Sequence, residues 1–154
     1  MVDYSALTMS TLPPGLTWLS CIVLEEGKKS VPGISGKVAE FIYFLMGSGY
    51  LKGPEDVHIV GFSMGTNIAS EAGHYIQHWT GRSIRRISGL DPAPNFSKKP
   101  WLTSDSAQFV DATFTWLGNR AKHKDIGHVQ FFMNGGRRQP NCPNIYPIAR
   151  TLLS

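Results

Sequence analysis

Cysteines, charges and long apolar runs are all scarce in this chain of 154 residues. Its two cysteines, Cys21 and Cys142, could pair with each other, stay free or bond to other partners, and the sequence does not choose among these states. No run of apolar residues approaches the length needed to span a bilayer, and residues 1–5 have neither the positive nor the apolar region of a signal peptide. With 42% hydrophobic and 17% charged residues, the composition favours one folded globular domain over a disordered chain.

The formal net charge is +4, with basic residues at 98–99, 120–124 and 137–138. Such residues could bind nucleic acid, but no aromatic residues alternate with them as contacts to bases would require. A solvated basic surface is therefore the favoured interpretation, and no nucleic-acid partner is expected. Mild attraction to an anionic lipid surface stays open. The chain contains no internal repeat and no low-complexity segment.

Apolar residues recur at two different periods along the chain. Helical spacing predicts a helix over residues 31–47, ended by the glycines that follow, and a second helix from Ser63 to about Gly81. The apolar faces of the two helices are Ile34, Val38, Phe41, Ile42 and Leu45, and Ile68, Ala72, Tyr75, Ile76 and Trp79. Shorter apolar runs predict strands over residues 56–61, 85–90, 107–114 and 128–133. Strands that alternate with helices predict an α/β fold with a parallel sheet.

The most informative motif is Gly61-Phe62-Ser63-Met64-Gly65, which directly follows an apolar strand. A Gly-x-Ser-x-Gly turn lifts a serine hydroxyl above the end of a sheet, where a base can take its proton. Glycines flank the serine because a Cβ would clash where the strand folds tightly into a helix. The motif alone also arises by chance, so an ordinary turn serine is the alternative interpretation of Ser63.

Asp91 lies 28 residues after Ser63, about the length of one strand-helix-strand unit. Both residues come just past the carboxyl end of a predicted strand, and parallel strands end at the same edge of a sheet. Open α/β sheets place their sites at that edge, so a nucleophile and a carboxylate are predicted side by side. The order of serine before acid fits the α/β hydrolases. A turn or cap residue is the alternative for Asp91, because Asp-Pro favours turns.

Several segments, taken together, resemble the pancreatic-lipase family of animal neutral lipases and phospholipases A1, especially its insect members. Residues 2–7 are similar to the family's VDWSAL strand end, residues 57–65 to its nucleophile strand and turn, and residues 81–93 to its GRxIxRITGLDPA block. Residues 106–111 and 126–136 continue the resemblance in the same order. The resemblance implies an α/β-hydrolase fold, in part, with residues 1–154 as one catalytic domain cut at both ends.

The resemblance gives three residues a role in a serine esterase. Ser63 matches the nucleophile and Asp91 the acid of the catalytic triad, and the backbone N–H of Met64 matches one oxyanion donor. The family's second oxyanion donor belongs to a segment that would lie before Met1.

The triad histidine is not found in this chain. In the family it lies beyond the matched blocks, and the 12 residues after Cys142 contain none. His128 matches a strand histidine that is not the family's base, and His123 lies in a polar Lys-His-Lys stretch. His58, His74 and His78 precede the acid and are interpreted as ordinary strand or helix histidines.

No cofactor or metal is expected. Asp105 is the only carboxylate between Asp91 and Asp111, so the segment that carries calcium in some relatives has lost most of its acids. Residues 113–116 replace the family's IHT pattern, so the contacts that this pattern makes on the substrate side do not carry over to this chain. The resemblance implies a secreted protein, in which case Asn95 begins a glycosylation sequon.

The predicted function is that of a lipase-family serine hydrolase acting on glycerolipid esters, either triacylglycerol or the sn-1 acyl bond of a phospholipid. Its partner would be a lipid or a lipid–water interface. Because the histidine is missing, the 154-residue chain alone is expected to be inactive. Two alternatives remain open. One is a non-catalytic lipid-binding or storage protein of the same fold, similar to the yolk proteins, and the other is a hydrolase of small soluble esters.

Overall fold

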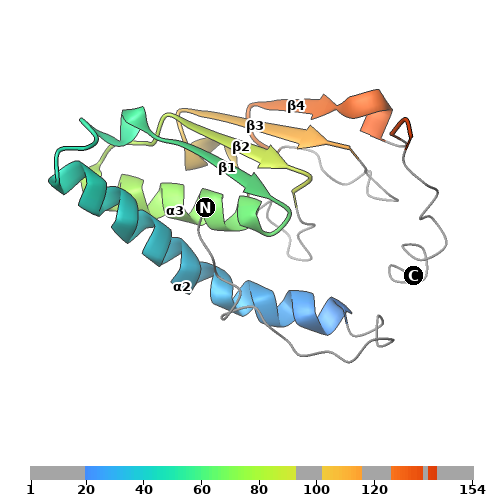
Figure 1. Cartoon of the computed structure of the whole chain (residues 1–154), viewed down its shortest axis with the longest axis horizontal. Helices are drawn as coiled ribbons and strands as arrows, with labels where there is room; N and C mark the ends of the chain where they lie inside the picture. The colour runs from blue at the N-terminus through green and yellow to red at the C-terminus, as the bar shows by residue number, and fades with distance from the viewer. Residues whose placement is uncertain (1–19, 93–101, 116–125, 137–138, 142–154) are drawn as a thin grey trace.

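The computed structural model describes residues 20–92, 102–115, 126–136 and 139–141, with side chains from Lys29 onward. Two helices and four strands lie in this part of the chain (Figure 1). Their bounds are α2 Ser20–Gly47, β1 His58–Phe62, α3 Gly65–Thr80, β2 Arg86–Leu90, β3 Phe109–Phe114 and β4 Val129–Phe132. Three short 3-10 turns accompany them: η2 Pro54–Asp56 precedes β1, η3 Ser104–Ser106 precedes β3, and η4 Met133–Gly136 follows β4.

The four strands form one parallel sheet in the order β1-β2-β3-β4. This arrangement confirms the α/β fold that the sequence predicts. Both helices lie on the same face of the sheet, with α3 as the crossover between β1 and β2 (Figure 1). In the described part of the chain, neither helix is both long enough and apolar enough to cross a membrane.

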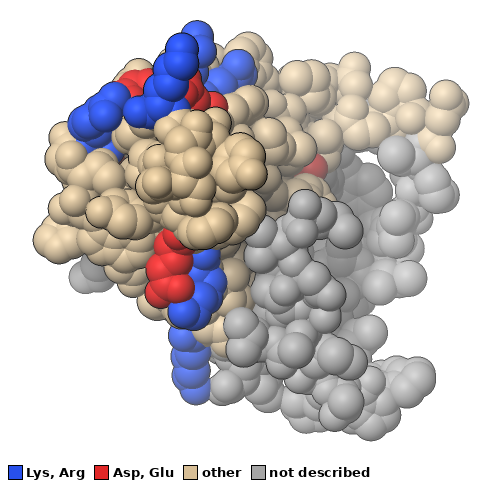
Figure 2. Space-filling model, turned by 60° about the vertical axis from the view of Figure 1, so that its left-hand side comes forward, with Lys and Arg blue, Asp and Glu red and all other residues tan. Residues whose placement is uncertain are grey.

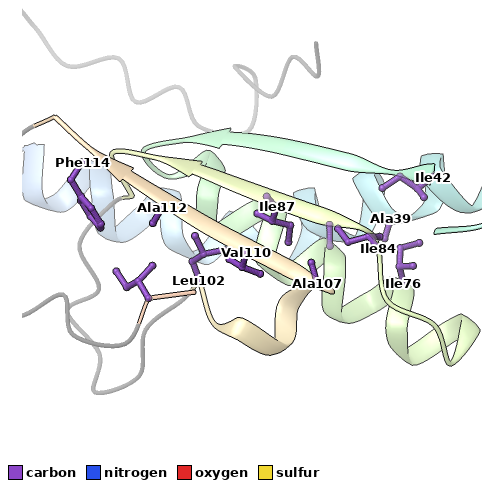
Figure 3. Packing of buried hydrophobic residues seen from close by; sticks show 13 residues of the cluster. Ala39, Ile42, Ile76, Ile84, Ile87, Leu102, Ala107, Val110, Ala112 and Phe114 are labelled. Atoms are coloured by element: carbon purple, nitrogen blue, oxygen red, sulfur yellow. The ribbon is translucent and has the colours of Figure 1, made fainter. Parts of the chain in front are cut away.

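The hydrophobic core lies between this face of the sheet and the two helices. The side chains of Ile87, Val110 and Ala112 point from the strands toward the helices, where Ile42 of α2 and Ile76 of α3 meet them (Figure 3). All five are 6% exposed or less. Because side chains alternate across a strand, every second strand residue joins this core and its neighbours point to the other face of the sheet.

The two predicted helices end where the sequence indicates, but one begins elsewhere. Helix α2 starts at Ser20, eleven residues before the predicted start, and continues through Pro32. Proline favours the first turn of a helix, whereas here it lies in the interior at the loss of one backbone hydrogen bond. The other helix, α3, ends at Thr80, with Gly81 in the left-handed conformation at φ 69°.

Two aromatic residues that the spacing assigns to apolar helix faces are exposed. Phe41 is 55% exposed because it lies at the margin of the buried face of α2, which includes Ile34, Ala39 and Ile42. Trp79 is 42% exposed and contacts two other aromatic rings. It stacks on Tyr75 at 5.7 Å between ring centroids and meets Tyr43 edge-on at 6.1 Å.

The second face of the sheet carries exposed apolar side chains. On β1, Val60 is 58% and Phe62 66% exposed. Parallel sheets normally bury both faces, so such exposure is unusual for strands of this kind.

Candidate active site at the carboxyl edge of the sheet

Ser63 lies in a tight turn between a strand and a helix. Strand β1 ends at Phe62, α3 begins at Gly65, and Ser63 between them has φ 51°, a left-handed conformation that a non-glycine residue rarely adopts. Its N–H donates to the carbonyl of Leu90 on β2 at 2.9 Å, and its own carbonyl accepts the N–H of Thr66 at 3.1 Å. These bonds tie the turn to both the sheet and the helix.

Gly61 makes this turn possible. A Cβ built on Gly61 would lie 2.5 Å from the carbonyl oxygen of Gly65 and 2.7 Å from the nitrogen of Thr66, both backbone atoms of the first turn of α3. The strand and the helix therefore approach each other more closely than any side chain at this position permits. Such a strained strand-to-helix bend is typical of the nucleophile turn of α/β hydrolases.

Asp91 occupies the equivalent place on the neighbouring strand. The register pairs Phe62 with Leu90, so Ser63 and Asp91 each directly follow the last paired residue of adjacent parallel strands. Asp91 also has a positive φ, 41°, and its N–H donates to the carbonyl of Thr113 on β3 at 2.8 Å. The register thus confirms that both residues lie at the carboxyl edge of one sheet.

Met64 directly precedes helix α3 as its N-cap residue. The first N–H groups of a helix have no acceptor within the helix and carry the positive end of its dipole. Met64 is the residue directly after Ser63. In α/β hydrolases the N–H of the residue after the nucleophile is one of the oxyanion donors.

The carboxylate of Asp91 is held by Thr115, for which the sequence predicts no contact with the acid. The N–H of Thr115 donates to Oδ1 at 2.7 Å, and its hydroxyl donates to Oδ2. Thr115 directly follows β3, as Ser63 follows β1 and Asp91 follows β2, so its place after a strand was the available signal.

A second residue without a predicted role, Gln139, supports Thr115 from the segment after η4. Its side-chain amide nitrogen donates to the carbonyl of Thr115 at 2.7 Å and to that of Met133 at 2.9 Å. Gln139 lies outside the helices and strands, and no pattern in the sequence indicates this contact.

The histidines of the described residues lie away from this edge. His58 is the first residue of β1, and His128 immediately precedes β4, so both lie at the opposite ends of their strands. The Nδ1 of His128 accepts the N–H of Val110 at 3.0 Å, which uses one of its two nitrogens. His74 and His78 belong to the second half of α3, which runs away from Ser63. His123 lies outside the described residues.

A polar cluster connects three strands on the face of the sheet away from the helices. Asp111 is buried, accepts Arg86 Nε at 2.7 Å and the Ser88 hydroxyl at 2.9 Å, and Ser88 lies 3.0 Å from His58 Nε2. Burial alone would raise the pKa of Asp111, but the hydrogen bonds from Arg86 and Ser88 outweigh it and lower the pKa below its usual value. Asp111 is therefore held as a carboxylate that joins β2 and β3.

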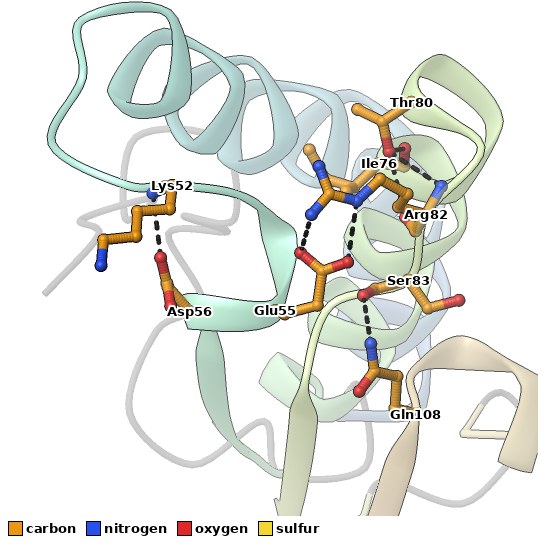
Figure 4. Close-up of polar contacts among 8 residues, drawn as sticks. All are labelled: Lys52, Glu55, Asp56, Ile76, Thr80, Arg82, Ser83 and Gln108. Carbon is orange, nitrogen blue, oxygen red and sulfur yellow. Dashed lines mark hydrogen bonds and ion pairs between the residues drawn. The ribbon is translucent and has the colours of Figure 1, made fainter.

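Charges of both signs mix on the surface at the amino edge of the sheet. Arg82 forms two hydrogen bonds to Glu55, at 2.8 and 2.6 Å, and these lower the pKa of Glu55 (Figure 4). Among the described residues on the face drawn in Figure 2, basic side chains lie beside acidic ones in the same way, and the basic residues at 98–99, 120–124 and 137–138 lie outside the described residues. Within the described residues, no group of three His, Cys, Asp or Glu side chains could hold a metal ion. The acid-poor segment at 93–101 lies outside them.

Comparison with known proteins identifies the family. Residues 25–151 match the family model described as Lipase. Pancreatic lipase-related protein 2 of Bos taurus is 39% identical over 121 residues, covering 68% of this chain and 24% of the relative. Phospholipase A1 member A of Rattus norvegicus is 34% identical, covering 75% and 25% of the two chains, and pancreatic triacylglycerol lipase of Sus scrofa is 34% identical, covering 76% and 27%.

The chain thus spans about a quarter of the length of these relatives. The family match covers far more than half of the chain and includes Ser63, Asp91 and the strands that carry them. Lipases have the α/β-hydrolase fold, which agrees with the parallel sheet and the nucleophile turn observed here. The chain belongs to the lipase family.

Proposed function

We propose that this chain carries the nucleophile and the acid of a serine hydrolase that cleaves glycerolipid esters. The observation that carries the proposal is the register of β1 and β2, which brings Ser63 and Asp91 to neighbouring positions at one edge of the sheet. A strained serine turn beside an oriented carboxylate suits acyl transfer, which needs an exposed and activated nucleophile. The packing of the fold does not require such strain.

The reaction would follow the usual course of a serine esterase. Ser63 Oγ attacks the ester carbonyl while a histidine accepts its proton, and Asp91 holds the imidazole in the tautomer that can accept it. The N–H of Met64 stabilises the oxyanion of the tetrahedral intermediate. Collapse of the intermediate releases the alcohol and leaves an acyl-serine, which water then hydrolyses to the free fatty acid.

The substrate class comes from the relatives and rests on the proposed activity. One relative is called a triacylglycerol lipase and another a phospholipase A1, and each is 34% identical to this chain. The equal similarity gives no preference between triacylglycerols and phospholipids. The proposal is therefore a glycerolipid ester at a lipid–water interface, with the protein secreted as the sequence resemblance implies.

The 154-residue chain alone is expected to be inactive. No described histidine reaches the carboxyl edge, and without a base the serine hydroxyl is a poor nucleophile near neutral pH. Loss of a triad residue typically lowers the rate by ~10⁴ to 10⁶-fold. Incubation of the purified chain with a fluorophosphonate should leave Ser63 unmodified, and labelling of Ser63 would overturn this expectation.

A chimera tests the function itself. Residues 25–151 replace the matching segment of bovine pancreatic lipase-related protein 2, which supplies the remainder of a lipase domain. The chimera is expected to hydrolyse a glycerolipid ester, with a loss of about 10⁶-fold in Ser63→Ala and about 10⁴-fold in Asp91→Asn. Ser104→Ala, at an exposed serine of η3, is the matched control and should retain full activity.

A folded chimera that is inactive, or one whose activity survives Ser63→Ala, would contradict the proposal. One observation favours the alternative of a non-catalytic lipid-binding protein, namely the distance of every described histidine from this edge. Binding of phosphatidylcholine vesicles by the folded chimera without release of fatty acid, with Ser63 intact, would support that alternative.

A further inference from the structure

We propose that Thr115 and Gln139 are positioning residues for the acid of this site, and that Gln139 couples Asp91 to the turn after β4. The inference rests on the proposed function, because it concerns the orientation of the carboxylate that would hold the imidazole. It starts from a continuous series of hydrogen bonds that runs from Asp91 through Thr115 and Gln139 to Asn134.

Thr115 fixes both oxygens of the carboxylate. Its N–H donates to Asp91 Oδ1 at 2.7 Å and its hydroxyl donates to Oδ2, so these two bonds constrain the plane of the group. Asp91 itself is held to β3 by the bond from its N–H to the carbonyl of Thr113. A carboxylate has about four acceptor positions, so two donors from Thr115 are compatible with an imidazole N–H as a further donor.

Gln139 fixes Thr115 in turn. The two bonds from its amide nitrogen go to two carbonyl groups, those of Thr115 and Met133. Its amide oxygen accepts from Asn134 Nδ2 at 2.7 Å. A flipped amide would place its oxygen against both carbonyl groups, so only one orientation satisfies all three bonds.

The position of this series gives it a role beyond general stability. Met133 and Asn134 belong to η4, and Asn134 has the left-handed φ of 48°, so Gln139 joins a constrained turn to the end of β3. Gln108 makes a comparable bond at the other end of the sheet, from its amide nitrogen to the carbonyl of Ser83 at 3.3 Å (Figure 4). That bond ends in an exposed connection instead of a carboxylate, which makes Gln108 a matched control.

The test uses the 154-residue chain labelled with ¹⁵N and ¹³C. Scalar coupling across the hydrogen bond is measured between the Thr115 amide nitrogen and the Asp91 carboxyl carbon, and hydrogen exchange is followed at the Thr115 amide. Gln139→Ala is expected to abolish the coupling and speed this exchange about tenfold, whereas Gln108→Ala should change it less than about twofold. The coupling from the Asp91 N–H to the Thr113 carbonyl reports an intact sheet in every variant.

The hydroxyl is tested separately with near-isosteric variants of Thr115. In the chimera, Thr115→Val should lower kcat by roughly 10- to 100-fold with KM unchanged, because the carboxylate is less well oriented in the transition state, and Thr115→Ser should restore it. The proposal is overturned if the wild-type chain shows no coupling to Asp91 while the Thr113 coupling is present. It is equally overturned if Gln139→Ala leaves exchange at Thr115 unchanged, or if Thr115→Val keeps full kcat. The coupling needs no catalysis, so an inactive chimera would contradict the proposed function without affecting this result.

Discussion

The replacement of Gly61 by alanine tests the nucleophile turn directly. The new methyl group would lie 2.5 Å from the Gly65 carbonyl oxygen, 2.6 Å from the Gly65 carbonyl carbon and 2.7 Å from the Thr66 nitrogen. Each distance is about 1 Å short of an ordinary carbon contact. Because all three atoms are backbone, a change of rotamer cannot relieve the clash, and the first turn of α3 must move away from β1.

The expected cost lies at the upper end of the range for overpacking, about 3 kcal/mol of unfolding free energy. For a chain of this size that corresponds to a decrease in Tm of roughly 6 to 12 °C. Differential scanning calorimetry or urea unfolding followed by circular dichroism measures it. The same substitution in the chimera should also lower activity, since Ser63 moves with the turn.

Gly33 provides the control for this experiment. It is an exposed glycine within α2, and a Cβ built on it would have no neighbour within 4 Å. Gly33→Ala should therefore leave stability unchanged or raise it by up to about 1 kcal/mol through helix propensity. If Gly61→Ala is as stable as Gly33→Ala, the close approach of β1 and α3 is wrong, and the argument for a strained serine turn fails with it.

Three further predictions concern the sheet that carries the site. Ile87→Ala removes a fully buried side chain from the core and should lower the unfolding free energy by about 2–5 kcal/mol in urea titrations, and a smaller loss would refute the packing of the core. Asp111→Asn should destabilise the chain at pH 7. The pKa of Asp111 is lower in the folded state than its value of about 4 in the unfolded chain, so the charged carboxylate stabilises the fold at any pH above about 4. That difference should shrink as the pH falls from about 4 toward the lower folded pKa, whereas a difference constant with pH would show that the charge contributes nothing. Val60→Thr, at an exposed apolar position of β1, should reduce the aggregation of the chain measured by light scattering. Unchanged aggregation would mean that the exposed apolar face of the sheet does not cause the chain to aggregate.

The sequence predicts the order of the elements well because its local signals are strong. Each predicted strand overlaps an observed one, and Gly81 ends α3 as expected. The joint position of Ser63 and Asp91 follows from topology alone, since parallel strands joined by a crossover end at one edge. These predictions depend on the spacing of apolar residues, the order of the elements along the chain and the positions of glycines, all of which can be read directly from the sequence.

What the sequence misses depends on contacts between distant segments. Helix propensity gives no reason for α2 to begin before Pro32. The bonds from Thr115 and Gln139 connect residues 24 positions apart in each case, and a hydrogen bond between separate loops leaves no periodic pattern. The contact of Trp79 with Tyr43 is of the same kind, because it joins α3 to α2.

The most direct measurement of the central claim is the site at which a fluorophosphonate reacts in the chimera. Peptide mass spectrometry is expected to find the phosphonate on Ser63, and Asp91→Asn should slow its attachment by about 10⁴-fold. Attachment to another residue of this segment, or equal rates with and without the Asp91 carboxylate, would contradict the account that these two residues form the reactive pair.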